Sequence, residues 1–500
     1  MKKILSILLV MLAVCVMFAS CGDEVATTTA AVKDSNIPEG LPSAEEVAAL
    51  GYAGDFKILV SGNYAWDDFD SNAYLGKEDP TVVDQAIYER NEMLKAAYGI
   101  NVVVEDVVDF GSTTKPGNGP GFQKMYTEYM SSTSTYAAAS IGTYDVAALA
   151  NYGLLWNLKN VPGIDLTKDY WDQKAEKDLS VLGKLYYTTG DIGVVNNKVT
   201  HAILFNKDMV ESYGMENPYD IVHANGWTLE KFTSLVKQVG EDLNQNGAHD
   251  ENDLYGLLTW NDPMVAILSS SGEKIAGVNE KGEIEYTLMN ERVVSLYDKF
   301  CNDLVFDFAH SYNYQYDSTT GAGTSSTVWD TNRIAMFNGN RAVFYLNTIA
   351  TIEKHRDSDV NFGVLPYPKL DAAQADYGHG VSPYHSQFVC VPLMTANPAR
   401  SGLVLEYLAA TGKTVLRPAY YDITLEGKSI RDVESAAMLD IIIASRVYDI
   451  GAYYDIGTVK TEIGRMFTSR RNITNIDASY GLAAKNAVET LNKQYKSLQY

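Results

Sequence analysis

The sequence predicts an α/β fold, because strand-like and helix-like segments alternate along its first part. Short apolar runs at residues 56–60 and 100–104 have the length of buried strands, and the segment between them carries apolar residues at helical spacing. A β-α-β order needs a crossover connection, so we expect the two strands to be parallel neighbours. The 500-residue chain is 46% hydrophobic and 11% aromatic, which suits two or more domains with cores of their own.

The helix between these strands is predicted from its two ends. Asp79 and Pro80 match an N-cap followed by proline at the first helical position, and Gly99 matches the glycine that commonly ends a helix. The pattern then predicts a helix over 122–132 and a strand over 144–149. This continued alternation supports the α/β prediction.

The N-terminal residues predict export. Lys2 and Lys3 precede an apolar run, Ile4–Phe18, that suits a signal peptide and is short for a membrane-spanning helix. Small residues lead into Cys21, which is similar to a bacterial lipobox and implies removal of residues 1–20 with a lipid on the cysteine. That anchor would hold the protein on the outer face of the bacterial cytoplasmic membrane. The alternative is an ordinary signal peptide with a chance cysteine.

Residues 21–54 are rich in small and polar side chains and show little periodicity, so we expect a flexible tether. The whole chain has a formal net charge of −23. Such an acidic surface repels nucleic acid and anionic lipid, so nucleic acid is excluded as a partner. We expect a monomer.

Seven segments resemble, in order, segments of the family 1 extracellular solute-binding proteins of ABC importers, the group that contains maltose-binding protein. One of them, Leu204-Phe-Asn-Lys-Asp208, is similar to the family's Tyr-Asn-Lys-Asp. The match extends from about Phe56 to the C-terminus. The other segments are Gly142–Val146, Tyr152–Leu158, Gly183–Tyr187, Gly226–Phe232, Phe337–Val343 and Phe362–Pro368.

The resemblance implies a two-lobed, periplasmic-binding-protein-like fold of type II, with lobes joined by hinge crossovers. Lobe one is expected at 55–200 and 362–412, and lobe two at 201–361 and 413–500. It also implies a receptor that closes on a carbohydrate, favouring an oligosaccharide, and then docks on the importer's membrane subunits without catalysing a reaction. Two alternatives remain open: a surface polysaccharide-acting enzyme or adhesin, and a sensory binding protein that feeds a kinase.

Candidate ligand-binding residues are polar and aromatic side chains on segments that the resemblance places at the cleft. Sugars stack on aromatic rings and need carboxylates, amides and arginine for their hydroxyls, and the chain has 34 tyrosines. Each candidate has an ordinary alternative as a core or surface residue, and Trp227 is assigned to the core. The candidates are Asn63, Tyr64, Trp66, Asp67, Asp145, Trp260, Asn261, Asp262, Arg341, Tyr345, Asn347, His385, Tyr448 and Tyr453.

A polar loop at 242–253 has the spacing of an EF-hand-type calcium site. Gly247 stands where the chain must turn sharply, although Asp253 stands where an EF-hand has glutamate. We expect a structural calcium ion, and the alternative is a polar turn without metal. The expected ligands are Asp242, Asn244, Asn246, the Ala248 carbonyl, Asp250 and Asp253.

Motifs of common enzyme classes are absent from the sequence. It contains neither Gly-x-Ser-x-Gly nor His-Glu-x-x-His, and Thr411–Thr414 imitates a phosphate loop in which Tyr407 replaces the required glycine. A glycosidase pair of carboxylates could still be hidden among the acidic residues. Cys301 and Cys390 are expected in different lobes, so we predict that they do not form a disulfide.

Overall fold

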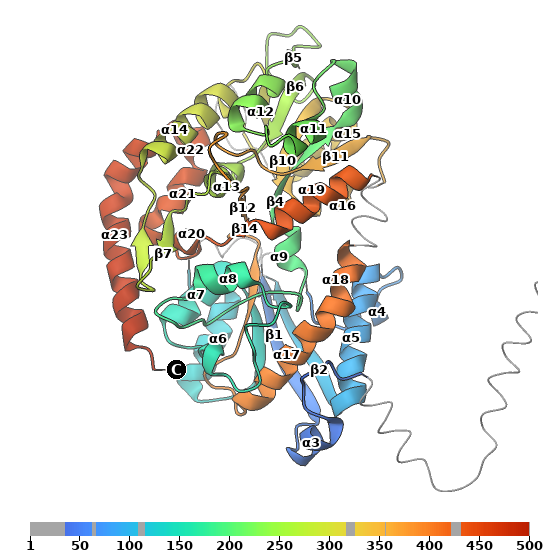
Figure 1. The fold of residues 1–500 in the computed structure, drawn as a ribbon, viewed down its shortest axis with the longest axis vertical. Coiled ribbons are helices and arrows are strands. Elements are labelled where there is room, and N and C mark those ends of the chain that lie inside the picture. The colour runs from blue at the N-terminus through green and yellow to red at the C-terminus, as the bar shows by residue number, and fades with distance from the viewer. Residues whose placement is uncertain are drawn as a thin grey trace, which may run out of the picture.

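The protein consists of two α/β lobes that lie one above the other along its longest axis (Figure 1). None of the described helices combines the length and the apolar character that a membrane span would need. The predicted signal peptide at 1–20 and the predicted lipid site at Cys21 lie outside the described residues. The computed structural model describes residues 36–62, 67–108, 116–316, 326–355, 357–421 and 432–499.

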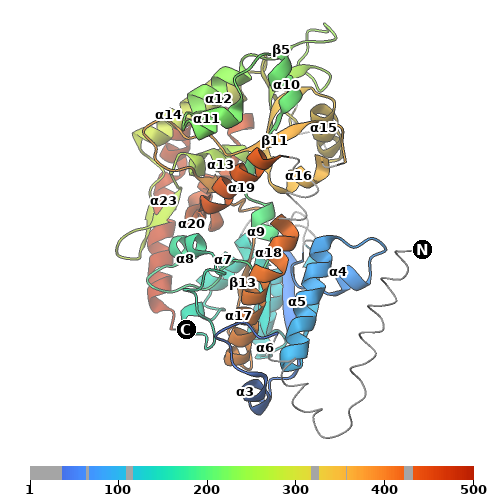
Figure 2. The ribbon, with the colours of Figure 1, turned by 45° about the vertical axis from the view of Figure 1, so that its right-hand side comes forward.

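Lobe one is built on a four-stranded sheet of order β13-β3-β1-β2. The first two strands of the chain are parallel, as predicted, with Gly54 opposite Ile100. Helices α5 and α17 lie side by side over one face of this sheet (Figure 2), whereas α6 and α7 pack on the other. The strands are β1 (Gly54–Gly62), β2 (Ile100–Val108), β3 (Ala138–Gly142) and β13 (Gln387–Cys390). The helices are α4 (Asn72–Leu75), α5 (Val82–Tyr98), α6 (Pro120–Ser131), α7 (Thr143–Asn151), α8 (Gln173–Leu179), α17 (Pro398–Thr414) and α18 (Leu416–Pro418).

Helix α5 ends at Gly99 as predicted, with this glycine in the left-handed conformation (φ 66°). Its start differs from the prediction, because Thr81 and not Asp79 is the N-cap. Thr81 accepts the Asp84 N–H, and the Asp84 carboxylate accepts the Thr81 N–H in return. This reciprocal capping box satisfies two otherwise unpaired backbone donors.

The strand predicted at 144–149 is wrong, because these residues belong to helix α7. The preceding residues, Ala138–Gly142, form strand β3 instead. Nearly all of α7 is buried, so its apolar run has no polar face to reveal the helical period. The helix predicted at 122–132 is confirmed as α6.

Lobe two is built on a six-stranded sheet of order β11-β4-β10-β6-β5, with β9 paired to β6. Strand β11 pairs antiparallel with β4, so the segment from 362, which we placed in lobe one, begins in lobe two. The strands are β4 (His201–Asn206), β5 (Gly240–Glu241), β6 (Leu254–Thr259), β9 (Ser311–Asn313), β10 (Ala342–Thr348) and β11 (Phe362–Leu365). The helices are α10 (Lys207–Ser212), α11 (Pro218–His223), α12 (Leu229–Val236), α13 (Pro263–Ser270), α14 (Glu291–Lys299), α15 (Ser326–Asn338), α16 (Ala350–His355) and α19 (Val433–Ala444).

The segment from residue 36 to residue 54 packs on lobe one, which corrects the prediction of a tether over its whole length. It forms helix α3 (Ala44–Ala49), in which Val47 is fully buried. The Tyr407 hydroxyl donates to the Asn36 carbonyl at 2.6 Å, and the Tyr98 hydroxyl donates to the Pro42 carbonyl at 2.6 Å. The tether prediction for 21–35 falls outside the described residues.

The chain passes between the lobes through α9 (Val195–Lys198) and through the paired strands β12 (His379–Gly380) and β14 (Arg446–Val447). Helix α23 (Ile473–Ser497) runs along one side of both lobes (Figure 1), contacting β8 and α14 above and α7 below. Cys301 and Cys390 do not form a disulfide, as predicted, and both are buried. The remaining elements are β7 (Ala276–Val278), β8 (Ile284–Tyr286), α20 (Ile450–Tyr453), α21 (Val459–Gly464) and α22 (Met466–Ser469).

Candidate functional site

A cavity of about 730 Å³ lies between the two lobes. Lobe one contributes the start of α7, lobe two contributes the loop from β6 into α13, and the crossover at 380–384 and the C-terminal segment complete the wall. The volume falls within the range of small-molecule sites, about 300–1,000 Å³. Its lining is rich in tyrosine: Tyr144, Tyr316, Tyr384, Tyr453 and Tyr480.

Asn261 and Asp262, two predicted ligand residues, line this cavity. They follow strand β6, and Asp262 immediately precedes α13. One Asp262 carboxylate oxygen accepts the Ser382 hydroxyl at 3.0 Å, and burial raises the pKa of the carboxyl. The Asn261 side-chain amide donates to the Tyr316 hydroxyl at 2.7 Å. Both residues therefore present polar groups where the strand ends.

Lys460, which the sequence analysis missed, joins the two sides of the cavity. Its Nζ donates to the Tyr144 hydroxyl at 2.7 Å and lies 4.5 Å from the centre of the Tyr144 ring. Burial lowers the pKa of Lys460, although the nearby carboxylates of Asp455 and Asp262 oppose this effect. Burial also raises the pKa of Tyr144, which keeps its hydroxyl protonated.

The turn before α21 places Lys460 at the cavity. Asp455, Gly457 and Thr458 all have left-handed backbone conformations, with φ of 40°, 57° and 62°. The Asp455 carboxylate holds this turn by accepting the Thr461 N–H at 3.1 Å and the Thr461 hydroxyl at 2.6 Å. A left-handed backbone is unfavourable for residues other than glycine, and no sequence pattern reliably predicts it. The sequence therefore did not show that this turn brings Lys460 to the cavity.

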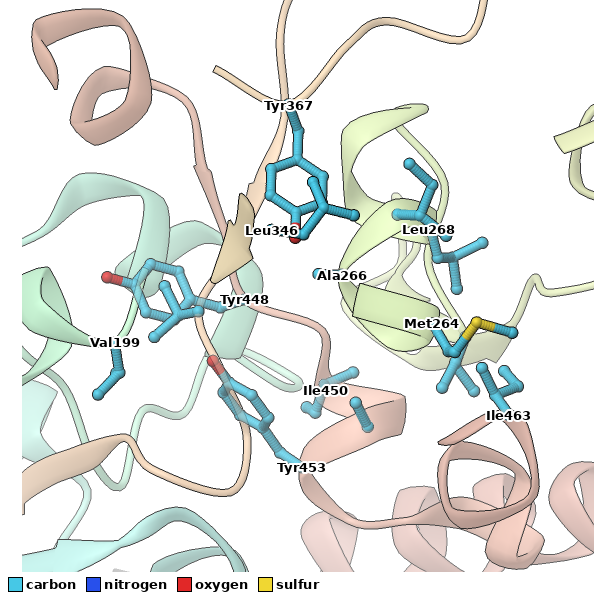
Figure 3. Packing of buried hydrophobic residues seen from close by; sticks show 14 of the residues in the cluster. Val199, Met264, Ala266, Leu268, Leu346, Tyr367, Tyr448, Ile450, Tyr453 and Ile463 are labelled. Atoms are coloured by element: carbon cyan, nitrogen blue, oxygen red, sulfur yellow. The ribbon is translucent and has the colours of Figure 1, made fainter. Parts of the chain in front are cut away.

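Tyr453, another predicted residue, lines the cavity from α20. Figure 3 shows its ring near Ile450 and below Tyr448 in the packing between the lobes. The buried Tyr453 hydroxyl has no hydrogen-bond partner among the described residues. Because almost none of this hydroxyl is exposed, it lies in the packing behind the cavity wall and not at the cavity itself.

Trp260 and His385 lie behind the cavity wall without lining it. The Trp260 ring stacks on His385 at 6.2 Å and on Tyr314 at 6.3 Å. Only 9% of Trp260 is exposed, and burial lowers the pKa of His385 to about 3. The pair therefore supports the crossover loop that carries Tyr384.

Three other predicted residues do not line the cavity, and their side chains form hydrogen bonds that support the fold. The Asp145 carboxylate accepts the N–H groups of Gly119 and Phe122, both at 3.0 Å, and so caps α6. The buried Tyr448 hydroxyl donates to the Asp172 carboxylate at 2.5 Å. Asp67 accepts the Phe69 N–H at 2.6 Å, and burial raises its pKa to about 7. Asn63, Tyr64 and Trp66 lie outside the described residues.

The predicted residues on β10 also lie away from the cavity. Arg341 precedes this strand and donates to the Glu251 carbonyl at 2.9 Å. It therefore lies at the start of β10, whereas the crossovers meet the sheet at the other end of the strand, near Thr348. Tyr345 is fully buried and accepts the Asn347 side-chain amide at 2.6 Å. The strand direction decides these positions, because β10 runs parallel to β6.

The predicted calcium loop connects β5 to β6 at the far end of lobe two (Figure 1). The Gly247 N–H donates to Asp242 at 2.8 Å, and buried Asp253 accepts the Leu243 N–H at 3.2 Å, so the loop closes on itself. Gly247 is left-handed (φ 75°), as the sharp turn requires. Among the described residues, no three His, Cys, Asp or Glu side chains are grouped closely enough to hold a metal ion. The side-chain oxygens of the loop are of the kind that binds calcium. Several of them accept hydrogen bonds from backbone N–H groups of the same loop.

Comparison with known proteins identifies the fold. No family model matches the sequence, and no curated protein matches it either. The chain is similar to solved structures of binding proteins. An ABC substrate-binding protein from Listeria monocytogenes in complex with cycloalternan matches with a TM-score of 0.53 at 13% identity, over 89% of this chain and 99% of that one.

Two further structures agree. A cyclo/maltodextrin-binding protein complexed with maltotetraose matches with a TM-score of 0.54 at 14% identity, over 89% of this chain and 98% of that one. The MalE maltose/maltodextrin-binding domain from Bdellovibrio bacteriovorus, bound to maltotriose, matches with a TM-score of 0.51 at 13% identity, over 89% of this chain and all of that one (100%). The chain therefore has the two-lobed, periplasmic-binding-protein-like fold of the extracellular solute-binding proteins of ABC transporters.

Proposed function

We propose that the protein is the solute-binding receptor of an ABC importer and that it captures a carbohydrate between its lobes. The observation that supports this function most directly is the cavity of about 730 Å³ between the lobes. Tyrosines from both lobes line it, together with the polar groups of Asn261, Asp262 and Lys460. Rings that can stack on a sugar and charged groups that can bind its hydroxyls are the two requirements of a carbohydrate site.

Two further observations support this proposal. Solved structures with this fold hold cycloalternan, maltotetraose or maltotriose. The crossovers between the lobes provide a hinge on which ligand binding can favour a closed form. The closed form then docks on the membrane subunits of the importer, and no covalent bond changes.

The test is calorimetric titration of the full chain with maltotriose, maltotetraose and cycloalternan, together with an assay for released sugar. Binding without turnover is expected. Tyr480→Ala, which removes a half-buried ring from the cavity lining, should weaken binding, whereas Tyr213→Ala, at an exposed tyrosine, should leave it unchanged. Hydrolysis of the sugar, or binding by none of the saccharides, would contradict the proposal.

We also propose that a lipid on Cys21 anchors the receptor outside the cytoplasmic membrane. Support comes from the sequence alone, in the apolar run Ile4–Phe18 and the small residues before the cysteine. Cells fed an alkyne-labelled fatty acid should label the wild type and not Cys21→Ser. Equal labelling of both would contradict the anchor.

The loop at 242–253 is proposed to bind calcium in a structural role. Its position at the far end of lobe two, away from the cavity, supports a role in stability and not in ligand binding. The oxygen side chains of Asp242, Asn244, Asn246, Asp250 and Asp253 and the Ala248 carbonyl would hold the ion.

A further inference from the structure

Two groups of opposite charge face the interlobe cavity without pairing with each other. Asp262 and Lys460 both line it, and each influences the pKa of the other through space. Neither forms an ion pair with any residue that the structure describes. Enclosed charges are normally paired, so two unpaired ones at one cavity need an explanation.

Both groups retain hydrogen-bonding capacity. Lys460 has three N–H donors, and the Tyr144 hydroxyl takes one of them. A carboxylate can accept about four hydrogen bonds, and Ser382 is the side chain that donates to Asp262 in the described part of the chain. The remaining donors and acceptors are therefore available to a ligand.

The other carboxylates at the cavity are already engaged. Asp449 accepts four backbone N–H groups, including that of Ile275 at 2.7 Å. Asp455 is occupied by Thr461, and Glu462 pairs with Arg465 at 3.0 Å. Unlike these three carboxylates, Asp262 and Lys460 keep most of their hydrogen-bonding capacity unused.

Packing fixes the relative position of these two groups. Asp262 precedes α13 and Lys460 lies on α21, and these two helices contact each other. Met264 of α13 points toward Ile463 of α21 (Figure 3), and both side chains are fully buried. The carboxylate and the ammonium are consequently carried by two helices that pack against each other, while Tyr144 contacts Lys460 from lobe one.

We propose that Asp262 and Lys460 together determine the ligand class, by binding the hydroxyls of a neutral sugar and disfavouring charged sugars. This inference rests on the proposed function. A hydroxyl can donate to Asp262 and another can accept from Lys460, because a hydroxyl is both donor and acceptor. The two charges of the site are close and opposite, so together they offer no net counter-charge. An acidic or an amino sugar would therefore lose the hydration of its charge, and the repulsion from one of the two groups would offset the attraction to the other.

Calorimetry on the full chain with matched oligosaccharides tests this proposal. The probes are neutral maltotriose, cellotriose and mannotriose, acidic trigalacturonate and basic chitosan trisaccharide. At least one neutral probe should bind more tightly than both charged ones. Lys460→Met and Asp262→Asn should each weaken it about 10- to 100-fold, because each removes a hydrogen bond to a charged group.

The charge preference provides a readout that a merely structural role would not change. Asp262→Asn should raise the affinity for trigalacturonate relative to the neutral sugar, and Lys460→Met should do the same for chitosan trisaccharide. Lys281→Met and Asp298→Asn, at exposed positions away from the cavity, are the matched controls and should change nothing. If Lys460→Met does not fold, Asp262→Asn still tests the preference.

The outcomes separate the two proposals. Tighter binding of a charged probe by the wild type, or unchanged neutral binding in both variants, overturns the role of Asp262 and Lys460 while carbohydrate binding stands. Binding of none of the probes overturns the proposed carbohydrate function, and this inference with it.

Discussion

Arg446 and Asp172 form a buried ion pair where the last crossover meets lobe one. The Arg446 Nη2 lies 2.7 Å from the Asp172 carboxylate, and the two side chains are 14% and 2% exposed. Asp172 also caps α8 by accepting the N–H groups of Lys174 and Ala175, and Arg446 donates to Asn197 of the first crossover. Two crossovers and lobe one thus converge on the Arg446 guanidinium.

Arg446→Met should therefore destabilise the protein strongly, because it leaves the Asp172 charge buried without its partner. Loss of one member of such a pair costs about 3–5 kcal/mol. Urea unfolding followed by tryptophan fluorescence measures the change. Lys168→Met, which breaks the exposed pair with Asp165 at 3.7 Å, is the control and should change the free energy of unfolding by less than about 1 kcal/mol. Equal changes in the free energy of unfolding for the two variants would show that the buried ion pair stabilises the protein no more than the exposed one.

Lys184→Met should loosen the C-terminal end of α23. The Lys184 Nζ donates to the carbonyls of Tyr495 and Leu498 at 2.6 and 2.5 Å, which satisfies acceptors that a helix end leaves unpaired. The loss is expected to be about 1 kcal/mol. Hydrogen exchange of residues 491–498 should become faster, while exchange in α5 stays the same. Unchanged exchange at the end of α23 would argue against this anchoring.

Acid should weaken the packing at the crossovers. Burial lowers the pKa of His201, His379 and His385 to about 3 in the folded protein, well below the value near 6.5 of an exposed histidine. A group with a lowered folded pKa contributes stability that is fully present above pH 6.5 and is lost as the pH falls from there toward 3.

His379→Gln tests this pH dependence. The His379 Nε2 accepts the Tyr367 N–H at 2.9 Å, and a glutamine carbonyl can also accept it without taking up a proton. The slope of the unfolding free energy between pH 6.5 and 4 should become shallower, by up to about 1.4 kcal/mol per pH unit. A wild-type slope in His379→Gln would contradict the buried-neutral state of this residue.

Calcium removal should lower the melting temperature if the loop at 242–253 holds the ion. An ion present at about 100 times its dissociation constant stabilises the folded state by about 2.7 kcal/mol. Differential scanning calorimetry with and without a chelator measures this difference, and Asp242→Asn should reduce it. A melting temperature that is the same in chelator and in calcium would leave the loop as an ordinary polar turn.

The sequence by itself determined the features that local patterns encode. The parallel pairing of the first two strands follows from one β-α-β unit, and Gly99 ends α5 because only a residue without Cβ adopts the left-handed conformation easily. Asn261 and Asp262, which line the cavity, could be singled out because they directly follow a strand. The α/β class itself was predicted from the alternation of segments.

Only the tertiary structure decided which side chains meet at the cavity. Tyr144 and Lys460 are 316 positions apart, and no local pattern brings them together. Residues 144–149 form a helix that is buried on nearly every side, so their sequence has no polar face by which the helical period could be recognised. Arg341 lies away from the cavity because the direction of β10 within its sheet places it at the opposite end. These outcomes depend on packing between segments that are distant in the sequence. A local sequence pattern does not specify such packing, because it arises only when the whole chain has folded.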